Sequence, residues 1–219
     1  MSQPSRMTAK KFHEQPGVGD WRVLFWGTYA FYATDDLAHA VTLVNGVASI
    51  AAELEHEPDL DVRPQGVTIR SFTYRDGSLS AKDAELARRV SEWATANGYT
   101  ADPSKLMVVQ FAVAQDAGAD TRPFWQAVLG YEPLGDGDAI DPQRRNPVVW
   151  THELTPPKPG RGRSHLDVSL PADIAQSRID AAVAAGGRIV SSAPEWTTIA
   201  SPENHGVDIA SWADFEDYE

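Results

Sequence analysis

Helical and strand-like periodicities alternate along the first half of the chain. Between residues 37 and 54, apolar side chains recur at spacings of three and four, which is the pattern of an amphipathic helix. Thr34-Asp35-Asp36 predicts its start, because a capping hydroxyl and acidic side chains favour the positive end of the helix dipole. Pro58 predicts that the helix has ended before it. The apolar positions are Leu37, Ala40, Val41, Val44, Val47, Ala48, Ala51 and Leu54.

Strands are predicted on either side of this helix, and a second helix follows them. Residues 22–26 and 28–33 carry the aromatic residues that suit a sheet face, and residues 66–74 alternate as a strand does. Ser80-Ala-Lys-Asp83 has the form of a capping box that opens a helix. Asn97-Gly98 predicts its end. The inner face of this second helix comprises Leu86, Ala87, Val90, Trp93 and Ala94.

The second half of the chain repeats one pattern twice. A strand, a helix, a glycine stop and further strands run from residue 107 to 154 and again from residue 164 to 212. A repeat at this scale predicts two supersecondary units that close on each other. The predicted organisation is a flexible leader (1–11), a first domain (12–98), a linker (99–104), a second domain (105–213) and an acidic tail (214–219).

Residues 52–60 hold the candidate chemistry of the first half. His56 lies among the carboxylates of Glu53, Glu55 and Glu57, just past the end of the predicted helix. Imidazole and carboxylate together supply the proton donor and acceptor that acid–base catalysis needs. A solvated, acidic helix end without function would use the same residues, so this alternative stays open on the sequence alone.

Composition and charge narrow the classes of function. The 219 residues carry a formal net charge of −12, which argues against binding to nucleic acid. The chain has no cysteine, which excludes disulfides and thiolate metal sites and fits a cytoplasmic protein. No apolar run resembles a signal peptide, and none is expected to span a membrane. The basic segment 158–163 is interpreted as a solvated connector, with a clamp for an anionic group as the alternative.

The elements of residues 12–97 resemble the pterin-4a-carbinolamine dehydratases. The likeness rests on the long helix, the His-x-Pro sequence, the extended stretch after it and Ser-Leu-Ser-x-x-Asp. The family pattern has two adjacent histidines before the proline and a third on the next strand. Here His56 matches the first, Glu57 and Thr68 occupy the other two places, and Thr73-Tyr74 replaces a Thr-His pair. The residues that carry the likeness are Trp21, Ala30, Phe31, His56, Pro58, Thr73, Leu79, Ser80 and Asp83.

This resemblance implies an α+β domain, with an antiparallel sheet covered by helices on one face. It also implies a hydro-lyase acting on 4a-hydroxytetrahydrobiopterin, from which a hydroxyl must leave a ring carbon. An imidazole can serve as acid or base in such a step near neutral pH. We therefore expect His56 and Glu57 to be catalytic, with Glu57 able to act as the acid only if it is buried. The expected substrate-binding residues are Glu55, Pro58, Thr68 and Asp83. A homodimer is expected from the same resemblance.

The repeat in residues 105–212 resembles the vicinal-oxygen-chelate family, the fold of glyoxalases and bleomycin-resistance proteins. Residues 124–131 (Phe-Trp-Gln-Ala-Val-Leu-Gly-Tyr), His165-Leu-Asp167 and residues 201–208 carry the likeness. The resemblance implies paired βαβββ modules that form a half-barrel. Both modules in one chain also resemble a fused type associated with actinobacteria.

In the second family, each repeat offers metal ligands from its first and last strands. At the aligned position of the first repeat stands Trp150, which cannot bind a metal, so His152 is the candidate and Glu153 its rival. Such nitrogen and oxygen donors suit Zn²⁺, Ni²⁺, Mn²⁺ or Fe²⁺. The expected ligands are Gln110, His152, His165 and Asp208.

Three hypotheses of function remain open. The first is a pterin-carbinolamine dehydratase with an attached glyoxalase-like module. The second is a metal-dependent lyase, isomerase or dioxygenase in the second half. The third is a binding protein that holds a small aromatic or oxygenated metabolite in a cavity of the second half, with Trp125, Trp150 and Trp196 as walls.

Overall fold

The computed structural model describes residues 6–115, 118, 120–135, 137–154, 164–200 and 206–211. The chain divides into two compact units, one formed by the residues up to Leu106 and the other by Met107–Ser211. The predicted tail (214–219), the basic segment (158–163) and the turn 201–205 lie outside the described residues. Both units combine helices and sheet, so the predicted α+β class is confirmed.

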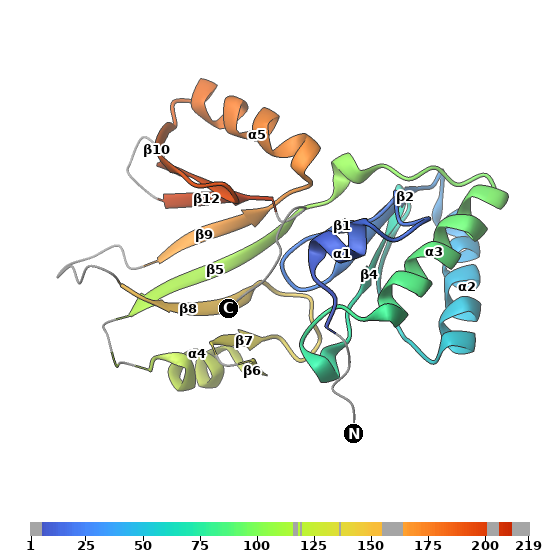
Figure 1. Ribbon diagram of the computed structural model, residues 1–219, viewed down its shortest axis with the longest axis horizontal. Helices are drawn as coiled ribbons and strands as arrows, with labels where there is room; N and C mark the ends of the chain where they lie inside the picture. The colour runs from blue at the N-terminus through green and yellow to red at the C-terminus, as the bar shows by residue number, and fades with distance from the viewer. Residues whose placement is uncertain are drawn as a thin grey trace. The chain divides into compact units, whose positions relative to one another are not determined.

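The N-terminal unit is a four-stranded antiparallel sheet with two long helices packed on one face (Figure 1). The strand order is β1-β2-β4-β3. Its elements are α1 (Ala9–His13), β1 (Arg22–Val23), β2 (Thr28–Ala33), α2 (Leu37–Leu54), β3 (Asp59–Arg63), β4 (Gly66–Ser71), η1 (Tyr74–Asp76), α3 (Ala81–Ala96) and η2 (Pro103–Lys105). The helices α2 and α3 and the capping box at Ser80 agree with the sequence prediction.

The core of this unit lies between the sheet and the two helices. Alternate residues of β2 and β4 face the helices and are buried, as the two-residue period of a strand requires. Gly46 of α2 lets the helices approach closely, because a Cβ built there would lie 2.4 Å from the indole ring of Trp93 on α3. The largest fully buried side chains of the unit include Phe12, Trp21, Leu24, Tyr32, Leu43, Ile69 and Leu86.

Two segments that were predicted to be loose are packed against this core. In the leader, Thr8 caps the short helix α1, and Met7 donates its amide hydrogen to the carbonyl of Leu79. In the linker, Tyr99 is buried in the same core and Ala101 bridges to Tyr32. Apolar side chains in segments of polar composition explain both differences, because their burial removes them from water.

Helix α2 also corrects the expectation about membrane spans. Among the described helices, α2 is long and apolar enough to cross a membrane by length and composition, with a mean hydropathy of 1.4. The same helix buries one face in the core of the N-terminal unit. Part of its apolar surface, including Leu43, Val47 and Ile50, is therefore used in packing.

The C-terminal unit is built on one eight-stranded mixed sheet with the order β10-β11-β12-β9-β5-β8-β7-β6. Strands β5 and β9 pair antiparallel at its centre, and each has a parallel neighbour from its own repeat, β8 and β12 respectively. The elements are β5 (Val108–Gln115), α4 (Arg122–Leu129), β6 (Glu132–Leu134), β7 (Asp138–Ile140), β8 (Val148–Glu153), β9 (Ser164–Ser169), α5 (Ala172–Ala184), β10 (Arg188–Ser192), β11 (Trp196–Ala200) and β12 (Gly206–Ala210).

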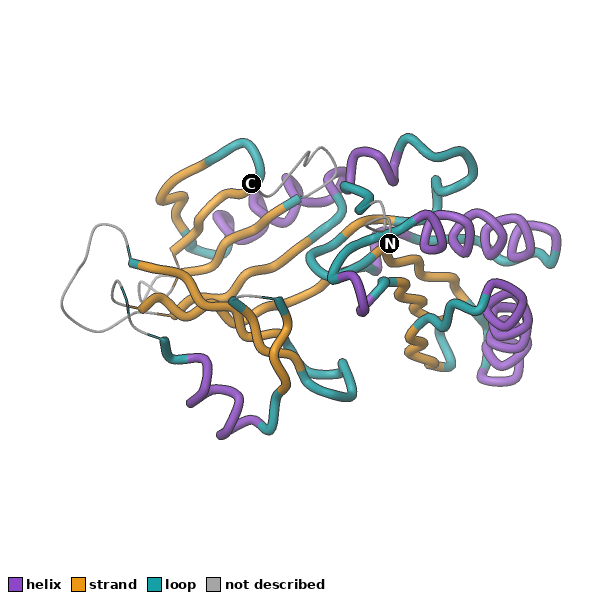
Figure 2. The backbone as a smooth tube through the Cα atoms, turned by 60° about the horizontal axis from the view of Figure 1, so that its bottom comes forward, coloured by secondary structure: helices purple, strands orange, loops and turns teal. Residues whose placement is uncertain are grey.

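Helices cover one face of this sheet. Helix α4 packs over β7, and α5 packs over β10, β11 and β12, so the two helices cover different ends of the sheet (Figure 2). Beneath α5, Ile179 meets Ile199 and Ile209, and beneath α4, Trp125 meets Val113 and Val149. The strand residues that alternate with these apolar ones carry the polar side chains of the opposite face.

We expect Gly46→Ala to destabilise the protein. The added methyl group collides with the Trp93 ring. Because overpacking typically costs more than alanine gains over glycine in helix propensity, we expect the free energy of unfolding to fall by about 1 kcal/mol. Urea unfolding of the whole chain measures the difference. Gly19→Ala is the control, because a Cβ there meets no atom within 4 Å. Equal stability of the two variants would contradict the close approach of α2 and α3.

Candidate functional site

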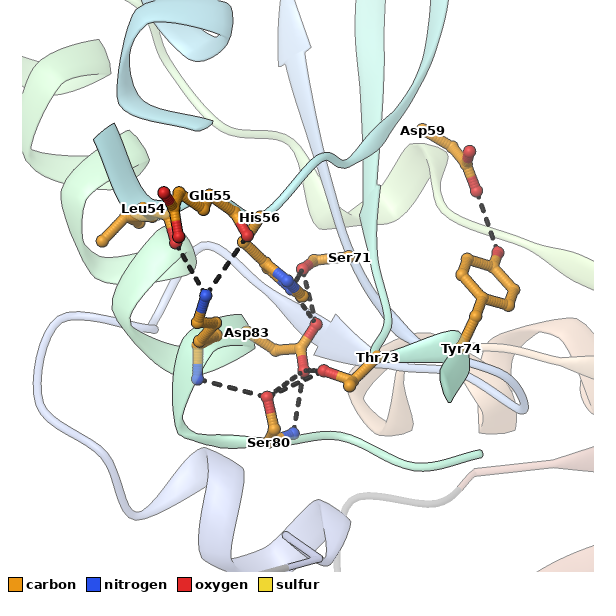
Figure 3. A network of polar contacts seen from close by, with 10 residues as sticks. Leu54, Glu55, His56, Asp59, Ser71, Thr73, Tyr74, Ser80 and Asp83 are labelled. Carbon is orange, nitrogen blue, oxygen red and sulfur yellow. Dashed lines mark hydrogen bonds and ion pairs between the residues drawn. The ribbon is translucent and has the colours of Figure 1, made fainter. Parts of the chain in front are cut away.

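The C-terminal cap of α2 sets the position of His56. Glu55 adopts the left-handed conformation (φ 49°, ψ 49°), and the amide of His56 donates to the carbonyl of Ala51. This is the Schellman arrangement, with glutamate at the position that glycine usually holds. Lys82, in the first turn of α3, donates to the carbonyls of Leu54 and Glu55 and fastens the turn. The turn directs the chain across the start of α3, and the imidazole of His56 lies there (Figure 3).

The fully buried carboxylate of Asp83 accepts hydrogen bonds from several segments of this region. One oxygen, Oδ1, lies 2.8 Å from His56 Nε2 and accepts the Ser71 hydroxyl at 2.6 Å. The other, Oδ2, accepts the Thr73 hydroxyl at 2.6 Å and the Ser80 amide at 2.8 Å. Asp83 thus connects the end of α2, the end of β4, the turn that follows β4 and the start of α3 (Figure 3).

These contacts keep Asp83 ionised. Burial alone would raise its pKa, but the hydrogen bonds from His56, Ser71 and Thr73 and the charge of the imidazolium hold the pKa below its ordinary value. An ionised carboxylate only accepts hydrogen bonds, so the nitrogen that faces it, His56 Nε2, must carry a hydrogen. In neutral His56, the bare nitrogen is therefore Nδ1.

The open nitrogen of His56 is Nδ1. The side chain of His56 is 11% exposed, and its polar contacts to Ser71 and Asp83 both use Nε2. Nδ1 has no hydrogen-bond partner among the described residues. It is also absent from the buried side-chain atoms that lack a partner, so this nitrogen is accessible. A molecule bound beside the ring would meet an oriented acceptor when His56 is neutral and a donor when it is protonated.

The other expected residues of this site lie in different surroundings. The side chains of Glu55 and Glu57 are exposed, so the burial that an acid role for Glu57 requires is absent. Pro58 is half-buried beside His56 and precedes β3. Thr68 pairs with Phe31 and Asp61 and, because side chains alternate along a strand, points to the face of the sheet opposite Ser71. Of the six expected residues, the structure joins His56 and Asp83.

Ser71 was not expected in this site, and its own position in the sequence explains why. It stands at the end of β4, fifteen residues after His56, and no local spacing connects the two. The strand alternation does place it on the helix side of the sheet, the face on which the site lies. Tyr74, at the place of a family histidine, donates its hydroxyl to Asp59 at 2.9 Å and holds the start of β3 against the turn.

The open face of the C-terminal sheet holds a second polar cluster. His165 and Asp167 on β9 point to one side, and the register of β12 places Asp208 beside Asp167. Nε2 of His165 lies 3.2 Å from Asp167 Oδ1 and 3.5 Å from Asp208 Oδ2. One potential ligand atom from each residue lies within 4.8 Å of the others, which is the spacing of a metal site.

Electrostatic interactions within this cluster are strong. The hydrogen bond that His165 donates to Asp167, opposed in part by burial, raises the pKa of His165 above its ordinary value, and the charges of Asp167 and Asp208 raise it further. Asp167 is 5% exposed, and the indole of Trp150 on β8 donates to its other oxygen. The cluster therefore has a carboxylate held in place by a tryptophan.

Of the four expected metal ligands, two lie in the cluster and two lie next to it. His165 and Asp208 lie in the cluster, with Asp167 as a third member that the expected set lacked. Gln110 is the cross-strand partner of Asp167, and the ring of His152 lies 5.6 Å from that of His165. Glu153 is exposed on the opposite face of β8.

The three tryptophans expected as cavity walls lie on different faces of the C-terminal sheet. Trp150 lies beside the cluster, and Trp196 shares its face of the sheet but is 41% exposed. Trp125 instead packs edge-on against Phe111 under α4, on the covered face. A helix position has no fixed face until its packing is known, so the sequence could not assign Trp125.

Comparison with known families divides the chain as the structure does. Residues 5–93 match the family "Pterin 4 alpha carbinolamine dehydratase", and residues 107–210 match the family "Glyoxalase-like domain". Both resemblances drawn from the sequence are confirmed.

Curated relatives match within the N-terminal unit, each named "Putative pterin-4-alpha-carbinolamine dehydratase". The protein of Nocardia farcinica is 40% identical over 55 residues, which are 25% of this chain and 58% of the relative. That of Thermomicrobium roseum is 33% identical over 64 residues, which are 29% of this chain and 69% of the relative. The chain thus spans little more than half of the first relative's length.

One solved structure is also similar to part of the chain. It is described as "transcriptional coactivator/pterin dehydratase from Brucella Melitensis". The match has 18% identity and a TM-score of 0.37 and covers 40% of this chain and 97% of that one.

Removal of the Asp83 carboxylate should destabilise the N-terminal unit more than removal of any exposed one. Asp83→Ala removes the acceptor of five hydrogen bonds, from His56, Ser71, Thr73 and the amide and hydroxyl of Ser80, which typically costs about 3–5 kcal/mol, and the milder Asp83→Asn costs about 1–3 kcal/mol. Urea unfolding at pH 7 measures both. Asp61→Asn is the control, since its carboxylate pairs with Arg63 at the surface and contributes about 0.5 kcal/mol or less.

The same variants predict a dependence on pH. The pKa of Asp83 is lower in the folded than in the unfolded chain, so its stabilisation is complete above about pH 4 and is lost as the pH falls through the folded-state pKa. The difference between wild type and Asp83→Asn should therefore shrink in acid. A difference that stays constant, or an Asp83→Asn loss no larger than that of Asp61→Asn, contradicts the network.

Proposed function

The chain belongs to the pterin-4a-carbinolamine dehydratase family, and we propose that its N-terminal unit catalyses dehydration of a 4a-hydroxytetrahydropterin with His56 as the acid–base group. The observation that carries this proposal is the contact of 2.8 Å between His56 Nε2 and the buried, ionised Asp83. It orients the ring and leaves Nδ1 for the substrate.

The proton balance of the reaction suits a single imidazole. The C4a–O bond breaks, the departing oxygen takes up one proton and leaves as water, and a ring N–H gives up one proton. No net proton is consumed. The ring N–H is that of N5, and because N5 and the departing oxygen are both bonded to C4a, Nδ1 of His56 can accept the proton from N5 and donate it to the leaving oxygen.

Asp83 acts in this proposal as a positioning residue. Its negative charge stabilises the imidazolium that forms when His56 takes up the ring proton, and its fixed place sets which nitrogen is free. Ser71 supports the same tautomer, because its hydroxyl donates to Asp83 and its oxygen can accept from Nε2. Glu57, exposed to solvent, is left without a chemical role.

We expect His56→Gln to lower kcat for loss of 4a-hydroxytetrahydropterin by a factor of about 10²–10⁴, because general acid–base catalysis contributes that much. A continuous absorbance assay against the spontaneous background measures it. Glu57→Gln should retain activity within about twofold, since its carboxylate is exposed.

The matched control is His39→Gln, which removes a histidine from the first turn of α2, at the end away from His56. Thermal unfolding of each variant establishes that it is folded under the assay conditions. No rate above the background for wild type, or equal rates for wild type and a folded His56→Gln, would overturn the proposal.

A second candidate function, metal binding, is favoured by the cluster on the C-terminal sheet. Asp167 Oδ1 is buried and lies 3.2 Å from His165 Nε2, which in turn lies 3.5 Å from Asp208 Oδ2. One nitrogen and two carboxylate oxygens suit Zn²⁺, Ni²⁺, Mn²⁺ or Fe²⁺. A bound ion would supply a Lewis acid for a substrate oxygen. The Trp150 indole would keep Asp167 in place.

One equivalent of divalent metal per chain is the expected result of elemental analysis after incubation with Zn²⁺ and desalting. His165→Ala should fall well below one equivalent, because it removes the nitrogen donor. Asp173→Asn, an acidic residue in the first turn of α5, is the control. Absence of stoichiometric metal in wild type, or equal loading of wild type and His165→Ala, contradicts this function.

The homodimer and the cytoplasmic location remain predictions. The exposed face of α2 favours a dimer, because from Ala38 to Ala52 its exposed residues are uncharged. Sedimentation velocity measures the state directly, and a monomer at micromolar concentration would exclude the stable form.

A further inference from the structure

A cavity of about 500 Å³ lies in the N-terminal unit, between the loop that precedes β1 and helix α3. This volume falls within the range of sites for small molecules, roughly 300–1,000 Å³. The wall near the end of α3 is exposed, so the cavity opens to solvent. None of the residues that line it takes part in the network around Asp83. The loop contributes Gly17, Gly19 and Asp20, and the helix contributes Ser91, Thr95 and Ala96.

Two glycines of the loop keep this space open. A Cβ built on Gly17, where φ is 78°, would lie 2.8 Å from Cγ of Arg88, so the loop packs directly on the stem of that arginine. A Cβ built on Gly19 would meet no atom within 4 Å. The loop is therefore close to α3 at Gly17 and leaves room at Gly19, next to Asp20.

A chain of buried hydrogen bonds ends at the carboxylate of Asp20. The indole of Trp21 donates to Ser91 Oγ at 3.1 Å, and the Tyr32 hydroxyl donates to Asp20 Oδ2 at 2.9 Å. Tyr32 has one hydrogen, which is already on Asp20, so Ser91 must be the donor in its contact of 3.2 Å with the Tyr32 oxygen. Burial raises the pKa of Tyr32 well above its ordinary value, so this hydroxyl keeps its hydrogen. Each hydrogen of the chain thus points toward Asp20.

The cavity is left with acceptors. Asp20 Oδ1 has no hydrogen-bond partner among the described residues, and it is not one of the fully buried atoms, so it is accessible. Glu92 adds a second carboxylate to the lining. The neighbouring cation, Arg88, already donates to Glu85 and Glu92 through three nitrogens. The hydroxyl hydrogen of Ser91 is used by Tyr32, so it cannot bind an anion.

We propose that this cavity binds a small organic cation, a primary ammonium group on a compact apolar body, with the ammonium on Oδ1 of Asp20. An ammonium donates three hydrogens and accepts none, which suits a wall where Asp20, Glu92 and Thr95 offer acceptor oxygens. The small residues Gly19 and Ala96 leave room for the apolar body. Hard metal ions, which take six or more oxygen ligands, fit this wall less well. The inference is independent of the dehydratase and of the metal site.

The test is an NMR titration of the ¹⁵N-labelled full chain with butylammonium chloride. Butanol and sodium butyrate serve as neutral and anionic probes of similar size. We expect butylammonium to give saturable shifts at the amides of residues 17–20 and 91–96 and at the indole N–H of Trp21, which belongs to the hydrogen-bond chain. Butanol and butyrate should give no saturable shift there at the same concentrations.

Asp20→Asn separates charge from structure, because asparagine still offers Tyr32 an acceptor oxygen. We expect it to weaken butylammonium binding by a factor of about ten or more, since a hydrogen bond to a charged group contributes that much. Asp61→Asn is the control, because it removes a surface carboxylate that pairs with Arg63 on β3. It should bind butylammonium as wild type does.

The wild-type titrations decide the proposal even if Asp20→Asn does not fold. Absence of saturable shifts with butylammonium, or equal shifts with butanol, overturns it. Wild-type affinity in an Asp20→Asn variant with an unchanged thermal midpoint also overturns it. An equal loss of affinity in Asp20→Asn and Asp61→Asn would mean general attraction to an acidic surface, which contradicts a site at Asp20.

Discussion

The N-terminal unit depends on one buried negative charge. Removing a carboxylate from water costs several kcal/mol, and such a group persists only when hydrogen bonds compensate it. The hydroxyls of Ser71 and Thr73, the Ser80 amide and the imidazole of His56 provide that compensation for Asp83. The carboxylate lies in the first turn of α3, where the helix dipole also favours negative charge. Stability and chemistry share this group, because the bond that neutralises Asp83 also selects the reactive nitrogen of His56.

In the C-terminal unit, the alternation of side chains along the strands separates an apolar face of the sheet from a polar one. One face of its sheet is apolar and covered by α4 and α5, and the other carries histidines, carboxylates and a tryptophan from the three strands β8, β9 and β12. Buried polar atoms normally find partners. Here His152 Nε2 has no hydrogen-bond partner among the described residues, and Asp167 Oδ1 has only the ion-pair contact of 3.2 Å with His165 Nε2; both atoms lie on this one face. Their common location is what a bound ion would explain.

Sequence reasoning reached the elements and part of the chemistry. The helix from residue 37 to 54, the capping box at Ser80 and the two-repeat pattern follow from local periodicity, which local forces set. The pairing of His56 with Asp83 depends on how two helix ends meet, and the family resemblance supplied only the names of the residues. Ser71 and Asp167 were missed in their roles because strand register, a non-local property, brings them to the sites. Glu57 was overvalued because its exposure cannot be read from its neighbours in the chain.

The central claim is that Asp83 holds His56 in the tautomer with hydrogen on Nε2 and a bare Nδ1. Nitrogen NMR of the ¹⁵N-histidine-labelled chain tests it most directly, with the His56 signals assigned by their loss in His56→Gln. At a pH where His56 is neutral, the account predicts a protonated-type resonance for Nε2 and an unprotonated-type resonance for Nδ1, with the two averaging toward each other in Asp83→Asn. Hydrogen on Nδ1, or an averaged pair of signals in wild type, would contradict it.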